Sequence, residues 1–230
     1  MSFAALPERL AQVRAEIARQ QAAGGWTHPV TIVAVTKGFG PDAVTAAFEA
    51  GLADVGENRV QEALDKMEGV TTPGVRWHLI GHLQRNKAKL VPGRFALVQS
   101  VDSLDLAEEL NRRATERLRV LLQVNVAREP QKSGCAAEQA PELARQVAGL
   151  GHLQLDGLMT LAPLTDDEDV QRRTFRSLRA LRDTIKEEGV WLPTLSMGMS
   201  ADYATAVAEG ATVIRLGTVL FGPREKERTP

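Results

Sequence analysis

The sequence predicts an α/β fold, a single-domain (β/α)8 barrel of the TIM type with an extra helix at its N-terminus. Three observations support this prediction. Eight short apolar segments recur along the chain, helical stretches separate most of them, and no linker or low-complexity segment interrupts the alternation. Such alternation is typical of a parallel sheet, and 230 residues are enough for one barrel. We therefore expect residues 1–230 to form one domain, with an open doubly wound sheet as the alternative.

The expected strands are short runs rich in Val, Ile and Leu. Continuous apolar runs are typical of strands that are covered on both faces, as in a barrel surrounded by helices. Most of these runs end in polar residues or glycine, which indicates where each strand stops. The expected strands are 30–35, 53–56, 75–81, 96–101, 120–126, 153–160, 194–197 and 212–216.

Helices are expected between these strands, and one more precedes the first strand. In that first helix Leu10, Val13 and Ile17 recur at three- and four-residue steps, and a glycine pair ends it. Only a short tail follows the eighth strand, so we expect the N-terminal helix to occupy the place of an eighth helix in the ring. The expected helices are 3–22, 41–50, 60–68, 85–90, 103–117, 143–150, 166–188 and 198–209.

The composition excludes several classes of function. The 28 basic and 29 acidic residues give a net charge of -1, so nothing in the charge favours nucleic acid or an anionic membrane as a partner. No apolar run is long enough to span a bilayer, and the charged N-terminus does not resemble a secretory signal. The single cysteine, Cys135, permits no internal disulfide, which fits a cytoplasmic protein. No Cys/His cluster has metal-ligand spacing, so we expect no metal site.

Lys37 is the first residue that indicates chemistry, because it follows the expected strand 30–35 almost directly. Function in this kind of barrel gathers at the carboxyl ends of the strands. Partial burial of a lysine yields a neutral amine, which Schiff-base chemistry requires. The alternative is that Lys37 simply reaches solvent where the strand ends.

Two turns after the last two expected strands are typical of a phosphate site. The segment 196–203 is a strand-to-helix turn with a glycine and two serines, and Gly217-Thr218 follows the eighth strand. The loops after strands seven and eight commonly bind phosphate in this fold, and backbone amides there are suitable donors. We expect Ser200, Gly217 and Thr218 to be the donors, with ordinary helix capping and turn formation as the alternative.

A lysine on the first strand and a phosphate site across the barrel mouth together describe one kind of ligand. It carries an aldehyde at one end and a phosphate at the other. Pyridoxal 5'-phosphate (PLP) matches this description, and the sugar-phosphate substrate of a Schiff-base aldolase matches it too.

Six segments closely resemble the YggS-like pyridoxal 5'-phosphate homeostasis proteins, a family of single barrels similar to the N-terminal domain of alanine racemases. The matches occur in order over nearly the whole chain. They are AVTK at 34–37, GENRVQE at 56–62, WHLIGHLQRNK at 77–87, GLMT at 157–160, SMGMS at 196–200 and RLGT at 215–218. The resemblance implies that residues 1–230 form one PLP-binding barrel domain.

The resemblance also assigns roles to individual residues. It implies that Lys37 holds PLP as an internal aldimine and that Arg215 faces the pyridine nitrogen. The residues implied to hold the phosphate are Ser200, Gly217 and Thr218, and those implied to line the pocket are Asn58, His82 and Met159. For Arg215 the alternative is a salt bridge to a nearby acid inside the barrel.

The resemblance implies a PLP-binding protein that buffers and transfers the cofactor in the cell, with little or no catalysis. The expected partners are the cofactor and apo forms of PLP-dependent enzymes as recipients, and we expect a cytoplasmic monomer. The alternatives are a PLP-dependent enzyme acting on amino acids, such as a racemase, and a Schiff-base aldolase. Racemases of this type use a tyrosine base from a second domain, whereas the only tyrosine of this sequence is Tyr203, expected at the start of a helix. The sequence therefore favours the cofactor-binding protein.

Overall fold

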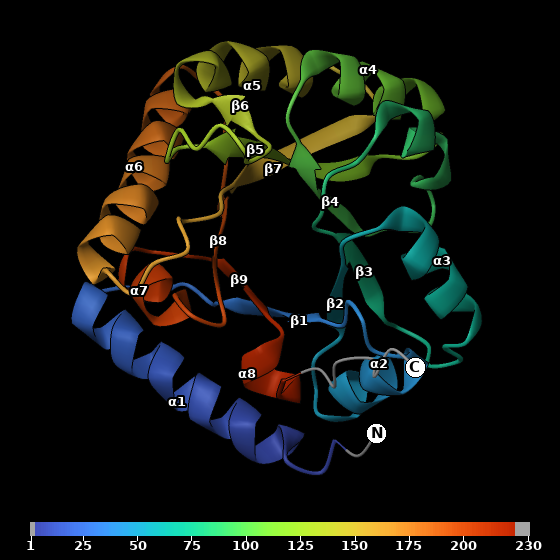
Figure 1. Cartoon of the computed structure of the whole chain (residues 1–230). Coiled ribbons are helices and arrows are strands. Elements are labelled where there is room, and N and C mark those ends of the chain that lie inside the picture. Colours follow the sequence, from blue (N-terminus) through green and yellow to red (C-terminus); the bar gives the residue numbers. More distant parts are fainter. Residues whose placement is uncertain (1–2, 224–230) are drawn as a thin grey trace.

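A closed barrel of parallel strands forms the centre of the computed structural model, which describes residues 3–223 (Figure 1). The order around the barrel is β4-β3-β2-β1-β9-β8-β7-β5, and β4 pairs with β5 to close it. This pairing excludes the open doubly wound sheet and confirms the predicted (β/α)8 fold class. Residues 1–2 and 224–230 of the predicted domain lie outside the described residues.

The barrel strands and the helices that surround them alternate along the chain, as predicted. The strands are β1 (Thr31–Val35), β2 (Asp54–Glu57), β3 (Arg76–Leu79), β4 (Leu97–Val101), β5 (Leu118–Asn125), β7 (Leu153–Met159), β8 (Thr194–Met199) and β9 (Val213–Leu216); the two-residue β6 (Cys135–Ala136) pairs only with β5. The helices are α1 (Leu6–Gly24), α2 (Pro41–Glu49), α3 (Val60–Glu68), η1 (Arg85–Leu90), α4 (Leu104–Arg113), η2 (Ala137–Gln139), α5 (Ala140–Ala148), α6 (Glu168–Glu187), α7 (Tyr203–Ala208) and α8 (Thr218–Phe221).

Helix α1 completes the helical ring, which confirms the prediction made for it. After β9 the described part of the chain continues into the short helix α8, and α1 lies across α7 and α8 on the outside of the barrel (Figure 1). The apolar stripe of α1 is buried through Leu6, Leu10, Val13 and Ile17. The N-terminal helix therefore buries its apolar stripe on the side of the barrel where α7 and α8 lie.

Two predicted helix boundaries differ from the structure by four residues or more. Helix α4 ends at Arg113 instead of residue 117, because Ala114 has extended backbone angles (φ -74°, ψ 132°) and β5 already begins at Leu118. Helix α7 begins at Tyr203 instead of residue 198, because β8 continues to Met199 through a shift in its register with β9. At Gly198 the backbone has a φ of +94°, which favours glycine.

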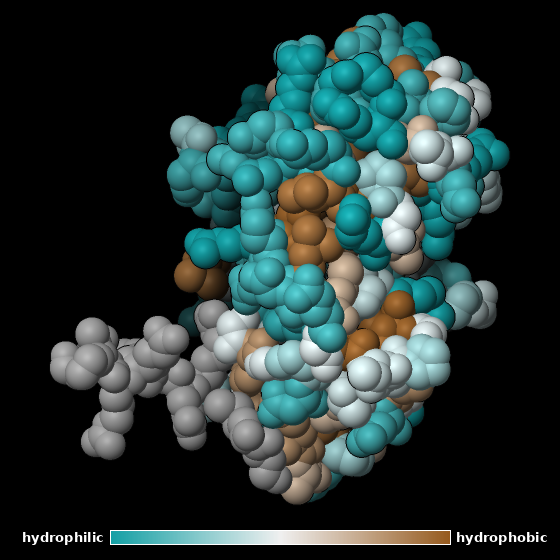
Figure 2. All heavy atoms as spheres, turned by 90° about the vertical axis from the view of Figure 1, so that its right-hand side faces the viewer, coloured by the Kyte–Doolittle hydropathy of each residue, from teal (hydrophilic) through white to brown (hydrophobic). Residues whose placement is uncertain are grey.

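The face of the helical ring that carries α3 is mainly polar. Figure 2 shows it as largely hydrophilic, with separate hydrophobic patches. This is the pattern of helices that bury one stripe against a barrel and expose the other to water. Within residues 3–223, no helix combines the length and the apolar character that crossing a bilayer requires.

Truncation of Leu10 tests whether α1 is an integral part of the barrel. The side chain is 2% exposed, so Leu10→Ala leaves a cavity between α1 and the barrel. We expect the free energy of unfolding to fall by about 2–4 kcal/mol in urea titrations. The exposed neighbour Gln12 provides the control, and Gln12→Ala should change the free energy by less than about 0.5 kcal/mol. Equal effects of the two substitutions would contradict the packing of α1.

Candidate functional site

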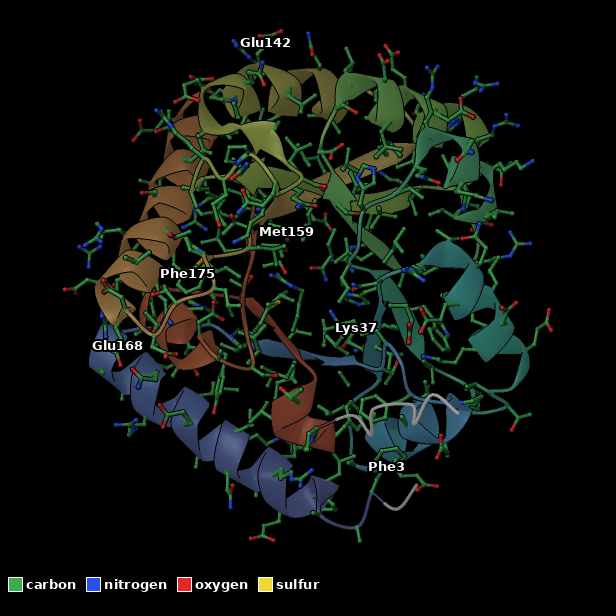
Figure 3. The ribbon with its side chains drawn as sticks, viewed as in Figure 1. Phe3, Lys37, Glu142, Met159, Glu168 and Phe175 are labelled. Atoms are coloured by element: carbon green, nitrogen blue, oxygen red, sulfur yellow. The ribbon has the colours of Figure 1, made fainter. Side chains whose placement is uncertain are left out.

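A cavity of about 560 Å³ lies at the carboxyl ends of the barrel strands. All of the predicted site residues except Met159 line it: Lys37, Asn58, His82, Ser200, Arg215, Gly217 and Thr218. These residues come from the ends of β1, β2, β3, β8 and β9, which are far apart in sequence but meet at one mouth of the barrel. Figure 3 shows Lys37 inside the ring of strands. The volume is typical of small-molecule sites.

Lys37 is held at the mouth by contacts to both of its neighbours. Strand β1 ends at Val35, Thr36 is fully buried, and the partly exposed Lys37 follows. Gly38 then turns the chain with a φ of +74°, and its backbone N–H donates to Glu62 Oε1 at 3.0 Å. The backbone around Lys37 is therefore fixed on both sides, which fixes the direction in which its side chain leaves the strand.

A buried ion pair behind the barrel wall fixes Thr36. Lys66 of α3 donates from Nζ to the Thr36 carbonyl at 2.8 Å and to Glu57 Oε1 at 2.5 Å. The Thr36 hydroxyl donates to the same Glu57 oxygen at 2.5 Å. Burial raises the pKa of Glu57, and the contacts with Lys66 and Thr36 oppose this rise. The Thr36, Glu57 and Lys66 cluster thus connects α3 to the residue preceding Lys37.

Ser200, directly after β8, lies beside the turn after β9 that carries Gly217 and Thr218, and all three line the cavity. The Ser200 hydroxyl accepts hydrogen bonds from the backbone N–H groups of Gly217 at 3.2 Å and Val219 at 3.3 Å. Two backbone amides therefore point at the Ser200 hydroxyl, which has one O–H of its own to donate beside the cavity. Backbone amides and a hydroxyl gathered at one turn are groups that suit the oxygens of a phosphate.

Arg215 is a buried cation at the wall of the cavity. Its side chain donates to Ser196 Oγ at 2.5 Å and to the Thr160 carbonyl at 2.8 Å, and the residue is 2% exposed. Burial lowers the pKa of Arg215 to about 10, while the nearby carboxylate of Asp202 opposes the shift. Within residues 3–223 the structure gives Arg215 no salt bridge to an acid, so the alternative role of Arg215 is not supported.

The three residues predicted to line the pocket differ in position. Asn58 and His82 line the cavity, and His82 Nδ1 lies 3.6 Å from the carboxylate of Asp102. Met159 is fully buried and packs inside the barrel against Leu97 and Leu121, so it supports the cavity from below. The sequence could not distinguish a residue that lines the cavity from one buried inside the barrel, because all three residues follow or end an apolar run.

Other cavity residues come from the long loop after β5. Lys132 lines the cavity, donates from Nζ to the Ala162 carbonyl at 2.7 Å and forms an ion pair with Glu129. Gln123 holds this loop in place by donating to the Ser133 carbonyl at 2.9 Å. The sequence places this loop directly after the carboxyl end of a barrel strand, which indicates that it could border the site. No motif, however, distinguished Lys132 from other lysines in loops.

Comparison with known proteins agrees with this architecture. Residues 9–225 match the family model of the alanine racemase N-terminal domain. The chain is therefore a barrel of the alanine racemase N-terminal domain class.

Closer relatives define the family within this class. The pyridoxal phosphate homeostasis protein of Pseudomonas aeruginosa is 42% identical over 96% of each chain, and that of Aquifex aeolicus is 39% identical over 95% of this chain and 98% of its own. The structure of PipY from Synechococcus elongatus with PLP bound aligns with a TM-score of 0.83 and 36% identity, covering 94% of this chain and all of PipY. The chain belongs to the pyridoxal phosphate homeostasis protein family.

Replacing Lys66 tests the cluster behind Lys37. Lys66→Met leaves the buried carboxylate of Glu57 without its cation, and we expect the free energy of unfolding to fall by about 3–5 kcal/mol. The pKa of Glu57 in the folded protein should then rise further. A carboxyl group whose pKa is higher in the folded than in the unfolded protein stabilises the folded state most at pH values below its pKa in the unfolded protein. This stabilisation is lost as the pH rises through its pKa in the folded protein.

The variant Lys66→Met should therefore lose stability, relative to wild type, as the pH rises from about 4 into the neutral range. Urea titrations across this range measure the trend. In the control Lys66→Met/Glu57→Gln no carboxyl remains to titrate, so the additional pH dependence should vanish. An unchanged pH dependence in the single variant would show that Glu57 is not held ionised by Lys66.

Proposed function

We propose that this protein binds PLP in the carboxyl-end cavity, with Lys37 as the covalent attachment point, and acts in intracellular PLP homeostasis. One observation carries the proposal: the amine of Lys37, the residues Ser200, Gly217 and Thr218, and the buried guanidinium of Arg215 line the same cavity. The family relationship and the PLP-bound structure of PipY support it. In this proposal, residues 1–230 form one PLP-binding domain.

The residues of the cavity suit the chemical groups of PLP. Its phosphate would be held by Ser200, Gly217 and Thr218, and its aldehyde would be met by Lys37. When bound, the cofactor would supply an aldehyde carbon, to which the amine of Lys37 would attach covalently with loss of one water. Asn58 and His82 border the remaining space.

In this proposal Arg215 determines the protonation state of the pyridine ring of bound PLP. A guanidinium offers only hydrogen-bond donors and keeps its proton at neutral pH. A pyridine nitrogen that faces Arg215 must therefore accept a hydrogen bond and stay unprotonated. PLP-dependent catalysis relies on the ring as an electron sink, and an unprotonated ring is a weaker one. The position of Arg215 thus argues against transaminase-type chemistry, which needs a strong electron sink.

The distribution of acid and base groups argues against racemase-type chemistry. Among the described residues that line the cavity, the titratable side chains are Lys37, His82, Lys132 and Arg215. Tyr203 lies on α7 and interacts electrostatically with Glu16 and Arg19 of α1, outside the barrel wall. A racemase-like exchange of protons would therefore have no tyrosine base in this cavity.

The proposed role includes buffering PLP and transferring it to apo PLP-dependent enzymes, by a monomer in the cytoplasm. Met199, which lines the cavity, is 42% exposed, so the cavity opens to solvent, and this supports exchange of the cofactor.

Visible absorbance tests the attachment point. The protein mixed with PLP should be yellow, and Lys37→Ala should abolish the colour because no amine remains beside the aldehyde. The control is Lys132→Ala, which removes the other lysine of the same cavity and should retain the colour. Reduction with borohydride followed by peptide mass spectrometry should place the added mass on Lys37. Colour retained by Lys37→Ala and lost by Lys132→Ala would reverse the assignment.

Proton exchange tests the absence of strong catalysis. The PLP-loaded protein is incubated with alanine in deuterated water, and exchange of the α-proton is followed by NMR. We expect a rate no higher than that of free PLP at the same concentration. Faster exchange that disappears in Lys37→Ala would contradict the proposal and favour an enzyme acting on amino acids.

A further inference from the structure

A continuous chain of hydrogen bonds crosses the interior of the barrel and ends at Arg215. Arg215 donates to Ser196 Oγ at 2.5 Å, Ser196 donates to Gln99 Oε1 at 2.6 Å, and Gln99 Nε2 lies 3.0 Å from His78 Nδ1. His78 Nε2 in turn lies 3.0 Å from Asp54 Oδ1. We call Asp54, His78, Gln99 and Ser196 the interior relay.

The interior relay connects the two ends of the barrel. Ser196 and Gln99 lie on β8 and β4, which are not neighbours in the barrel order, so their hydrogen bond crosses the interior. Arg215 lines the carboxyl-end cavity, whereas Asp54 and His78 line a second cavity of about 390 Å³. Asp54 also accepts from Arg76 at 2.8 Å at that second cavity. The chain therefore extends from one cavity to the other.

The hydrogen bonds of the interior relay have one consistent direction. Burial alone would raise the pKa of Asp54, but hydrogen bonds from His78 and Arg76 outweigh it and lower the pKa to about 2. The ionised Asp54 can only accept, so His78 carries its proton on Nε2 and accepts at Nδ1 from the Gln99 amide. The Gln99 carbonyl oxygen then accepts from Ser196, whose oxygen accepts from Arg215. Every group donates toward Asp54.

Burying the polar side chains of the interior relay costs free energy, and we relate this cost to the cation of Arg215 at the end of the relay. Gln99 and Ser196 are fully buried, and His78 is 5% exposed. Buried polar groups cost free energy, and apolar side chains of similar volume would fill a barrel interior more cheaply. A dipole chain that ends in a carboxylate compensates the buried charge of Arg215 and limits the orientations of its guanidinium. Without Ser196, Arg215 would retain one hydrogen bond, to the Thr160 carbonyl.

We propose that the interior relay positions Arg215: Asp54, His78, Gln99 and Ser196 hold its guanidinium oriented toward the ligand cavity. The relay residues are positioning residues, since none of them lines that cavity. The orientation of Arg215 toward a cofactor ring rests on the proposed function, whereas the relay itself is a property of the protein without cofactor. The two claims are therefore tested separately.

The first test uses nitrogen-15 NMR on the protein without cofactor. We expect His78 to be neutral with its proton on Nε2, and the Arg215 side-chain signals to show slow rotation of the guanidinium. Gln99→Met interrupts the relay without removing a direct partner of Arg215. It should shift the His78 ring signals and speed the rotation of Arg215. Unchanged Arg215 signals in a folded Gln99→Met variant would overturn the proposal.

The second test measures PLP binding by equilibrium dialysis and the absorbance of bound PLP. Ser196→Ala removes a hydrogen bond to a charged group, so affinity should fall about 10-fold or more, with a shifted absorbance maximum. Gln99→Met should shift the maximum in the same direction with a smaller loss. The two substitutions together should be less than additive, because they interrupt one chain.

Leu121→Val is the matched control. Leu121 is fully buried inside the barrel next to Met159 and is not part of the relay. The control should lower stability without shifting the absorbance maximum, and an equal shift would assign the effect to packing and overturn the proposal. If one relay variant fails to fold, the other still interrupts the chain at a different bond. Failure of the wild-type protein to bind PLP would overturn the proposed function, while the NMR test would still decide the relay.

Discussion

The buried charge of Arg215 is the constraint on which much of the barrel interior depends. A guanidinium removed from water must have its donors satisfied and its charge compensated. The structure meets this requirement with a hydroxyl, a backbone carbonyl and the nearby Asp202, and not with a salt bridge among the described residues. Because no carboxylate takes up its donors directly, Arg215 remains available to a ligand in the cavity. The polar residues at the centre of an otherwise apolar barrel follow from this one cation.

The site is supported from both sides of the barrel wall. The interior relay holds Arg215 on β9, and the cluster of Thr36, Glu57 and Lys66 holds the backbone before Lys37 on the outer side. Strands β1 and β9 are hydrogen-bonded neighbours, with Val33 opposite Arg215. The amine and the guanidinium therefore emerge from adjacent strands whose positions are fixed independently. Such independent support preserves the geometry of a site when one contact fluctuates.

Much of the fold and part of the site could be predicted from the sequence. Continuous apolar runs identified the strands, and the rule that function lies at their carboxyl ends led to Lys37, Ser200, Gly217 and Thr218. The start of α7 could not be predicted, because the extension of β8 through Gly198 depends on its pairing with β9. The interior relay could not be predicted either, because its members lie on four strands and no local pattern connects them. Met159 was misplaced because the sequence does not reveal how deep a strand-end residue lies in the barrel.

The two supports differ in how they respond to solution conditions. The outer cluster contains a carboxylate whose pKa is raised by burial, so its contribution changes with pH. The relay ends in Asp54, whose pKa of about 2 keeps it ionised in the neutral range. Arg215 also keeps its charge there, with a pKa of about 10. The charges of Asp54 and Arg215 are thus constant over the neutral range, so the relay that positions Arg215 does not change with pH there.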